Sequence, residues 1–295
     1  MTPQTVHIPS SGGAVLGARC WSPLGARAVV LLHPATAVTQ GYYEAFAGYL
    51  AAQGFHVVTY DYHGTGRSLG GSLRESRATM LGWMMDDVAA VTRWAAARFT
   101  GLPLLAVGHS VGGHAIGLSP ETPRLKAAVL VASHAGASRT VRGFVERLRV
   151  RFLLRVLAPG LCALFGYMPG RRMGLGEDLP RGVMLQWARW TALPRYFFDD
   201  PAVDAARRMA RVEIPLLVLG FDDDPWANRE AVGMLVSHFT HARVERHEID
   251  PRTAGVPAVG HMGFFRRRCE PVLWKQVAHW LGVHARQTEA LDDVR

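Results

Sequence analysis

Two stretches of the chain hold residue types that together can do nucleophilic chemistry at a carbonyl carbon. Ser110 lies in GHSVGG, with a glycine two positions before it and another two positions after it. A serine hydroxyl is a poor nucleophile by itself, so it needs a base within hydrogen-bond reach and an acid that holds the base. His261, in GHMGFF, is the candidate base.

The glycines around Ser110 predict a sharp turn from a strand into a helix. In such a turn the serine adopts an unfavourable backbone conformation that raises its hydroxyl above the edge of a sheet. Side chains at Gly108 and Gly112 would collide in the turn, which explains both glycines. Gly113 we assign to close packing at the start of the helix.

The acid is expected in GFDDDPWA, directly after an apolar run. Serine sites of the strand–turn–helix kind carry their partners in the chain order serine, acid, histidine, and this segment has the required place. Asp222, Asp223 and Asp224 cannot all face one imidazole. Counting from Gly220 favours Asp223, whereas counting back from the following turn favours Asp224. We expect Asp224, with Asp223 as the alternative.

Two backbone N–H groups are needed to stabilise the oxyanion that forms when serine attacks a carbonyl. Val111 offers one, at the start of the helix after Ser110, where the helix dipole favours negative charge. The second is expected from HPATAV, at residues 33–38. Pro34 has no N–H, so Ala35 is the expected donor, with Thr36 as the neighbour that can replace it or add its hydroxyl.

Buried strands and amphipathic helices alternate along the chain and must position these residues. Continuous rather than alternating hydrophobicity indicates strands covered on both faces, as in a parallel sheet. Helical spacing predicts helices over residues 42–53 and 78–99. The apolar runs are 28–32, 55–60, 104–107, 127–132 and 214–219. This alternation predicts an α/β fold with a doubly wound, mostly parallel sheet.

The ends of the chain and one internal segment depart from the alternation. Runs at 5–9 and 14–21 predict an antiparallel hairpin, and a last helix is expected from about Pro271 to Leu281. The segment after residue 136 reads as a helical cap over the carboxyl ends of the strands. The expected division is a core at 1–136, a cap at 137–205, the rest of the core at 206–283 and a polar tail at 284–295.

The predicted cap contains an amphipathic helix and several aromatic residues. We interpret its apolar stripe, made by Val141, Val145, Leu148, Phe152 and Val156, as a face packed on the site, with Arg147, Arg151 and Arg155 in water. The less favoured alternative is attachment of this basic amphipathic helix to anionic lipid. The substrate pocket is expected to be shaped by His134, Trp187, Trp190 and Phe197.

Composition narrows the class of protein. The 295 residues carry 33 Lys and Arg against 24 Asp and Glu, a formal net charge of +9, but no nucleic-acid recognition signature accompanies the arginines. No segment has the roughly 18 uninterrupted apolar residues of a membrane span, and the N-terminus lacks the pattern of a signal peptide. Three widely spaced cysteines without a C-x-x-C pattern suggest reduced thiols and a cytoplasmic location.

The chain resembles the α/β-hydrolases, and more narrowly their bacterial serine-aminopeptidase-like or monoacylglycerol-lipase-like branch. The resemblance rests on HPATAV, GFHVVTYDYHGTGRS, GHSVGG, FGYMPGRRMGLGEDLP and the stretch from DPWA to GHMGFF, and it spans residues 6–281. It implies a serine nucleophile, no metal or organic cofactor, and hydrolysis of an ester, thioester or amide. His33-Pro34 is a departure, because many relatives carry His-Gly there.

The sequence therefore predicts a serine hydrolase that cleaves a small or acyl-chain ester or thioester through an acyl-enzyme. Amide or peptide hydrolysis and acyl transfer by the same triad are alternatives, as is a non-catalytic, membrane-associated binding protein on the same scaffold. No metal ligand set is expected, since none of the histidines has a recognisable zinc spacing. We expect a small-molecule partner and no nucleic acid.

Overall fold

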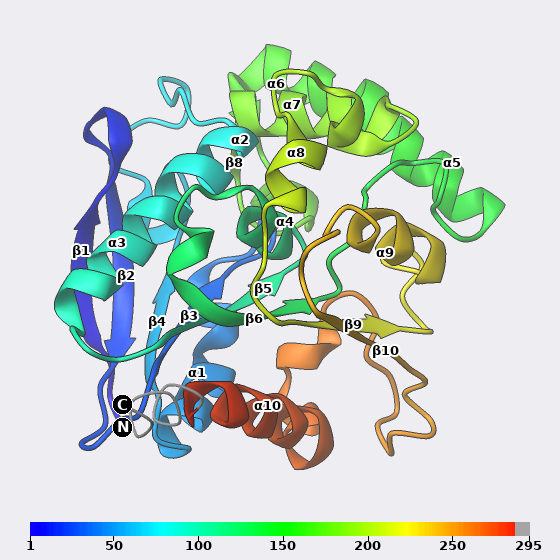
Figure 1. Ribbon diagram of the computed structural model, residues 1–295. Helices are drawn as coiled ribbons and strands as arrows, with labels where there is room; N and C mark the ends of the chain where they lie inside the picture. The colour runs from blue at the N-terminus through cyan, green and yellow to red at the C-terminus, as the bar shows by residue number, and fades with distance from the viewer. Residues whose placement is uncertain (287–295) are drawn as a thin grey trace.

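An eight-stranded sheet forms the centre of the computed structural model, which describes residues 1–286 (Figure 1). The strand order is β1-β2-β4-β3-β5-β6-β9-β10. The bounds are β1 Gln4–Pro9, β2 Val15–Trp21, β3 Val29–His33, β4 His56–Tyr60, β5 Leu104–His109, β6 Leu125–Val131, β9 Leu216–Phe221 and β10 Val244–Ile249. All five predicted apolar runs are strands of this sheet, which confirms the predicted fold class.

Pairing within the sheet is parallel from β4 to β10 and antiparallel at the N-terminal edge. β1 and β2 form the predicted hairpin, and β2 joins the rest of the sheet by pairing antiparallel with β4. Every residue of β3, β5 and β9 is buried, which explains why these segments are continuously apolar. Strand β10 was not predicted. Its sequence, VERHEI, is half charged because it lies at the edge of the sheet, where side chains reach solvent.

Helices cover both faces of the sheet, with α1 and α10 on one face and α3 and α4 on the other (Figure 1). Their bounds are α1 Glu44–Ala52, α2 Met80–Gly82, α3 Val88–Arg98, α4 Val111–Leu118, α8 Ala205–Ala210, α9 Arg229–Val236 and α10 Lys275–Arg286. A π-helical turn at 83–87 joins α2 to α3, so the predicted helix over 78–99 is one continuous element.

The C-terminal helix is longer than predicted. It continues past Leu281 to Arg286, and His284 is buried against the body of the protein rather than part of a polar tail. The imidazole of His284 contacts the Trp280 carbonyl oxygen through Nδ1, one turn earlier, which ties the last turn to the helix. The remainder of the predicted tail, residues 287–295, lies outside the described residues.

The segment between β6 and β9 contains three further helices and a two-stranded hairpin. The helices are α5 Phe144–Phe152, α6 Ala158–Phe165 and α7 Arg181–Ala192, and the strands are β7 Tyr167–Met168 and β8 Leu179–Pro180. A π-helical turn at 153–157 makes α5 and α6 one continuous helical stretch. In Figure 1 these helices gather at one end of the molecule, apart from those that cover the sheet.

The orientation of α5 differs from the expected one. Val145, Leu148 and Phe152 are exposed, by 77%, 59% and 56%, and of the predicted stripe only Val141 is buried. The inner side of the helix is formed instead by residues such as Val150 and Leu154. The prediction was wrong because the helix carries apolar residues on two sides, and periodicity alone does not tell which side meets the core.

Two further observations concern the helices and the cysteines. Within residues 1–286, no helix is both long enough and apolar enough to cross a bilayer. Cys20, Cys162 and Cys269 are free thiols buried in the protein, and burial raises the pKa of each of them. Buried thiols with a raised pKa have little thiolate and are poor nucleophiles at neutral pH.

Candidate active site

Ser110 sits in the predicted sharp turn, between the end of β5 and the start of α4. Its φ is +52°, a conformation that side chains other than glycine rarely adopt. Close packing forces the turn: a Cβ at Gly112 would lie 2.2 Å from the His33 carbonyl oxygen, and one at Gly108 would lie 2.4 Å from the Gly112 carbonyl carbon. Both glycines are therefore steric requirements of the turn that holds Ser110.

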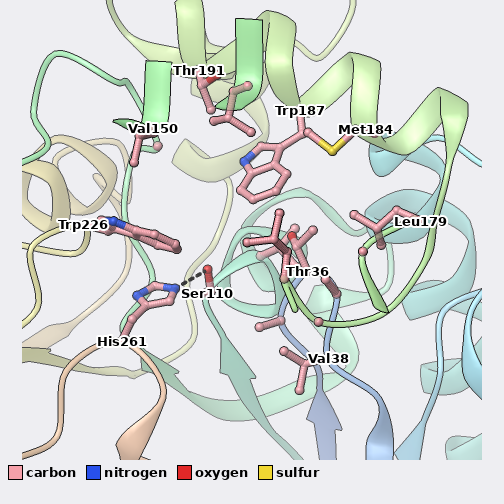
Figure 2. Close-up of a pocket in the computed structure, with 18 of the residues that line it drawn as sticks. Thr36, Val38, Ser110, Val150, Leu179, Met184, Trp187, Thr191, Trp226 and His261 are labelled. Carbon is pink, nitrogen blue, oxygen red and sulfur yellow. Dashed lines mark hydrogen bonds between the residues drawn. The ribbon is translucent and has the colours of Figure 1, made fainter. Parts of the chain in front are cut away.

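His261 connects Ser110 to a carboxylate. Its Nε2 lies 3.1 Å from Ser110 Oγ and its Nδ1 lies 2.8 Å from Asp224 Oδ2 (Figure 2). Because an ionised carboxylate only accepts hydrogen bonds, Nδ1 carries the proton and Nε2 is free to accept the serine proton. The geometry is that of a nucleophile, a base and an acid that orients the base.

Asp223 and Asp224 have different partners. Asp224 is fully buried, and its Oδ1 accepts hydrogen bonds from the N–H groups of Trp226 and Ala227 at 2.8 and 3.0 Å. Burial by itself raises the pKa of the Asp224 carboxyl, but the hydrogen bond and charge of His261 outweigh it and hold this pKa below its usual value. Asp224 is thus held as the anion that a protonated His261 requires.

The carboxylate of Asp223 holds the backbone of the histidine loop instead. Its oxygens accept hydrogen bonds from the N–H groups of Val259 and Gly260, both at 2.8 Å, just before His261. The two neighbouring carboxylates therefore have different structural roles. One fixes the loop that carries the imidazole, and the other contacts the imidazole itself.

A buried hydrogen-bond chain joins the loop after β3 to the loop of His261. The Ala35 N–H donates to Tyr43 Oη at 2.8 Å, Tyr43 Oη contacts His109 Nδ1 at 2.9 Å, and His109 Nε2 contacts the His261 carbonyl oxygen at 2.9 Å. Because a carbonyl oxygen only accepts hydrogen bonds, His109 donates from Nε2. Its Nδ1 therefore accepts a hydrogen bond from the Tyr43 hydroxyl. Burial lowers the pKa of His109 to about 3, which keeps this single-proton form at neutral pH.

The hydrogen bonds from Ala35 through Tyr43 and His109 to His261 change the expectation for the oxyanion donors. The Ala35 N–H is occupied by Tyr43 and is not directed at the space beside Ser110. Among residues 1–286, by contrast, neither the Val111 N–H nor the Thr36 N–H donates to another group. Val111 and Thr36, the alternative donor, both line the cavity at Ser110, so their N–H groups are available to an oxyanion there. Tyr43 was not anticipated, since no pattern in the sequence marks it.

Replacing Tyr43 by phenylalanine tests whether the hydrogen-bond series through Tyr43 and His109 positions His261. Tyr43→Phe keeps the ring but leaves the Ala35 N–H and His109 Nδ1 without a partner, so the loop of His261 loses its link to the β3 loop. We expect kcat for ester hydrolysis to fall about tenfold with little change in KM. The matched control is Tyr60→Phe, which removes a similar buried bond of 2.9 Å to His33 Nδ1. Equal losses of kcat in the two variants would contradict a positioning role.

A cavity of about 610 Å³ opens above Ser110 and His261, beneath the helices between β6 and β9. Figure 2 shows the Trp187 indole on the upper side of the cavity, above and to one side of Ser110, and the Trp226 ring next to His261. His134 and Trp187 line the cavity as expected. Most of the other lining side chains are apolar: Val38, Val141, Val150, Leu153, Leu154, Met168, Leu179 and Met184.

Two of the expected pocket residues do not reach the cavity. Trp190 and Phe197 are fully buried behind its wall, and the Trp190 indole N–H donates to Asp200 Oδ2 at 2.7 Å. Their neighbours Thr191 and Tyr196 line the cavity in their place. The error is one of helix phase, because adjacent residues of a helix face different sides and the aromatic spacing does not say which side is hollow.

The cavity is flanked by histidines that stay neutral. Burial lowers the pKa of His114 to about 3 and that of His134 to about 4, with the nearby imidazoles as a further cause. His134 stands 5.3 Å from the His261 ring, centre to centre. Within the described chain no three His, Cys, Asp or Glu side chains are grouped as a metal site. No Lys or Arg of residues 1–286 lines the cavity either.

Backbone strain gathers at this site. Within residues 1–286, five residues other than glycine have positive φ: Ala37, Ser110, Ala132, Tyr196 and Asp204. Ala37, Ser110 and Tyr196 line the cavity. Such conformations cost about 1–3 kcal/mol each and persist where the surrounding structure fixes them, which is common at functional sites.

Comparison with known proteins gives a family match over part of the chain and a shared fold over nearly all of it. A family model described as serine aminopeptidase, S33, matches residues 25–168, and a search of curated proteins finds no match. Among solved structures, a lipase in an open form has a TM-score of 0.63 at 17% identity, covering 97% of this chain and 100% of that one.

Two solved esterases are similar over comparable lengths. A Pyrococcus furiosus esterase gives a TM-score of 0.62 at 14% identity, covering 97% of this chain and 91% of that one. A Thermogutta terrifontis esterase gives 0.59 at 19% identity, covering 96% and 99%. TM-scores of about 0.6 over nearly the full length of both chains indicate a shared overall fold. The chain thus has the α/β-hydrolase fold, and its residues 25–168 match a hydrolase family of that fold.

Proposed function

We propose that this protein is a serine hydrolase that cleaves carboxylic esters, or thioesters, through an acyl-enzyme. The observation that carries the proposal is the hydrogen-bonded series from Ser110 through His261 to Asp224, placed at the floor of an apolar cavity. Nucleophile, base and acid within hydrogen-bond distance are what covalent catalysis by serine requires. The esterases and the lipase that share the fold are in keeping with it.

In the first half-reaction, His261 Nε2 takes the proton of Ser110 as its oxygen attacks the ester carbonyl carbon. The carbonyl oxygen becomes an oxyanion beside the N–H groups of Val111 and Thr36, which we assign as its donors. Asp224 stabilises the imidazolium that forms. The tetrahedral intermediate then collapses: the bond to the leaving alcohol breaks, and His261 returns the proton to that alcohol.

The second half-reaction releases the acid. Water enters the place of the departed alcohol and gives its proton to His261 as it attacks the acyl carbon. Collapse of the second tetrahedral intermediate breaks the bond to Ser110 Oγ, which recovers its proton from His261. Neither half-reaction needs a cofactor.

Residues 137–205 we assign as a cap that shapes the substrate site. Its inner side chains, including Val150, Leu154 and Met184, supply much of the apolar wall. An apolar cavity of about 610 Å³ without a cationic lining residue among the described residues favours an uncharged acyl chain over a substrate with a free carboxylate. We therefore expect medium acyl chains to be preferred to peptides.

A substrate panel tests this function. Hydrolysis of p-nitrophenyl esters of graded chain length is measured beside matched thioesters and anilides, for the wild type and for Ser110→Ala. We expect kcat/KM to rise from the acetate to a medium chain, and activity to fall by at least about a thousandfold in Ser110→Ala. Higher kcat/KM on the anilide than on the matched ester would point to amide hydrolysis, and activity retained in Ser110→Ala would exclude the serine mechanism.

A further inference from the structure

The outer side of the stretch from α5 to α6 is an apolar surface that nothing in the described chain covers. Its large side chains are 56–78% exposed. They are Phe144, Val145, Leu148, Phe152, Val156 and Leu164, and we call this set the outer row. Both exposed phenylalanines of residues 1–286 belong to it. Contiguous apolar exposure of this kind marks an interaction surface, because single apolar residues scattered over a surface would not gather on one helix.

The apolar character of the outer row is not a by-product of packing. Packing against the body of the protein uses the other side of the same stretch, where Leu154 and Ala158 are buried and line the cavity. Figure 1 shows α5 at the margin of the molecule, near α9 and away from the sheet. The outer row therefore faces solvent and contributes little to the packing of the described residues.

Positive charge accompanies the outer row. Residues 142–156, which carry most of the outer row, contain five arginines and a single acidic residue, Glu146. Arg149 and Arg151 are exposed between the apolar side chains of α5. Glu146 offsets little of this charge, since its Oε2 lies 3.8 Å from Arg149 while its Oε1 accepts a hydrogen bond from the Trp226 indole. The surface thus combines apolar side chains that avoid water with cations that attract anions.

We propose that the outer row of α5–α6 docks on an anionic lipid surface. Apolar side chains flanked by arginines on an exposed helix match the interface of a bilayer, where the side chains enter the acyl boundary and the guanidinium groups meet anionic headgroups. A second copy of the chain fits less well, because pairing two such surfaces about a two-fold axis would bring the arginines of both copies together.

The proposed docking places the cavity next to the membrane. Val150 and Leu153 line the cavity from the inner side of the helical stretch whose outer side carries Leu148 and Phe152. One helical layer, about 10 Å across, would therefore separate the lipid headgroups from the cavity above Ser110. An apolar ester dissolved in the bilayer would have a short route to the site.

Vesicle binding tests the proposal without relying on catalysis. The full-length Ser110→Ala protein is sedimented with vesicles of phosphatidylcholine alone or with about one third phosphatidylglycerol, at low salt and at about 0.5 M NaCl. We expect binding to the anionic vesicles at low salt, at least about tenfold weaker binding to the neutral ones, and release at high salt. Absence of binding to anionic vesicles at low salt would overturn the proposal, whatever the activity of the wild type.

Surface variants locate the contact. Leu148→Ser with Phe152→Ser should weaken partitioning at least about tenfold, and Arg149→Gln with Arg151→Gln should weaken it to the anionic vesicles alone, about fivefold for each charge. The matched control is Leu24→Ser, at a fully exposed leucine far from the cap in sequence, which should change nothing. Equal losses in the control and the cap variants would overturn the proposal. So would a dimer in sedimentation that Phe152→Ser dissolves, together with absence of vesicle binding.

Discussion

Asp224→Asn is expected to lower kcat by about four orders of magnitude while the protein stays folded. The amide cannot hold His261 in the tautomer that leaves Nε2 free, because its NH₂ group would face Nδ1 as a donor. The substitution also removes the buried negative charge that stabilises the protonated His261. Steady-state kinetics on a medium-chain p-nitrophenyl ester, with circular dichroism and thermal melting as checks of folding, measure the effect.

The neighbouring Asp223→Asn is the control, because it makes the same chemical change one residue away. Its carboxylate accepts from the N–H groups of Val259 and Gly260 and does not contact the imidazole. We expect a lower melting temperature and a loss of kcat within about tenfold, since one of two loop hydrogen bonds is lost. A near-normal Asp224→Asn beside an Asp223→Asn that loses several orders of magnitude would reverse the assignment of the acid.

Gly112→Ala is expected to destabilise the protein by more than about 3 kcal/mol, a large share of the stability of a typical protein. The added Cβ would lie 2.2 Å from the His33 carbonyl oxygen, and backbone cannot move aside without shifting β3. Gly113→Ala offers a comparison, because its Cβ would meet a side chain, at 2.0 Å from Ser133 Oγ.

The two alanine variants should therefore respond differently to a second change. Ser133→Gly removes the side chain that obstructs Gly113→Ala, and we expect the double variant to recover at least about half of the lost stability. The same Ser133→Gly should not help Gly112→Ala. Urea titration gives the free energies of unfolding of the single and double variants for this comparison. A Gly112→Ala protein as stable as the wild type would contradict the steric explanation of the turn.

The sheet and the turn at Ser110 could be predicted because they follow from local constraints. Strands such as β5 and β9 are buried on both faces and must be continuously apolar, and the turn excludes side chains at Gly108 and Gly112. Gly113 fits the same reasoning, since it packs against Ser133, two residues after the end of β6. Each of these signals lies within a few residues of the feature that it predicts.

What depends on contacts between distant segments could be predicted only by a small margin, as for Asp224, or not at all, as for Tyr43. The choice between Asp223 and Asp224 depends on where residues 259–261 come to lie, and the engagement of Ala35 depends on Tyr43, a residue without any motif. The outward face of α5 escaped prediction for a related reason. A helix that is apolar on two sides gives the same periodicity whichever side is buried.

The most direct test of the account is covalent labelling of Ser110. A fluorophosphonate probe reacts with a serine only when a base activates it, so the reaction reports the arrangement of Ser110, His261 and Asp224 without a substrate having to be known. We predict stoichiometric labelling of the folded wild type, located at Ser110 by peptide mass spectrometry and absent in Ser110→Ala. Absence of labelling on the folded wild type, or labelling that persists in Ser110→Ala, would contradict the assignment of Ser110 as an activated nucleophile.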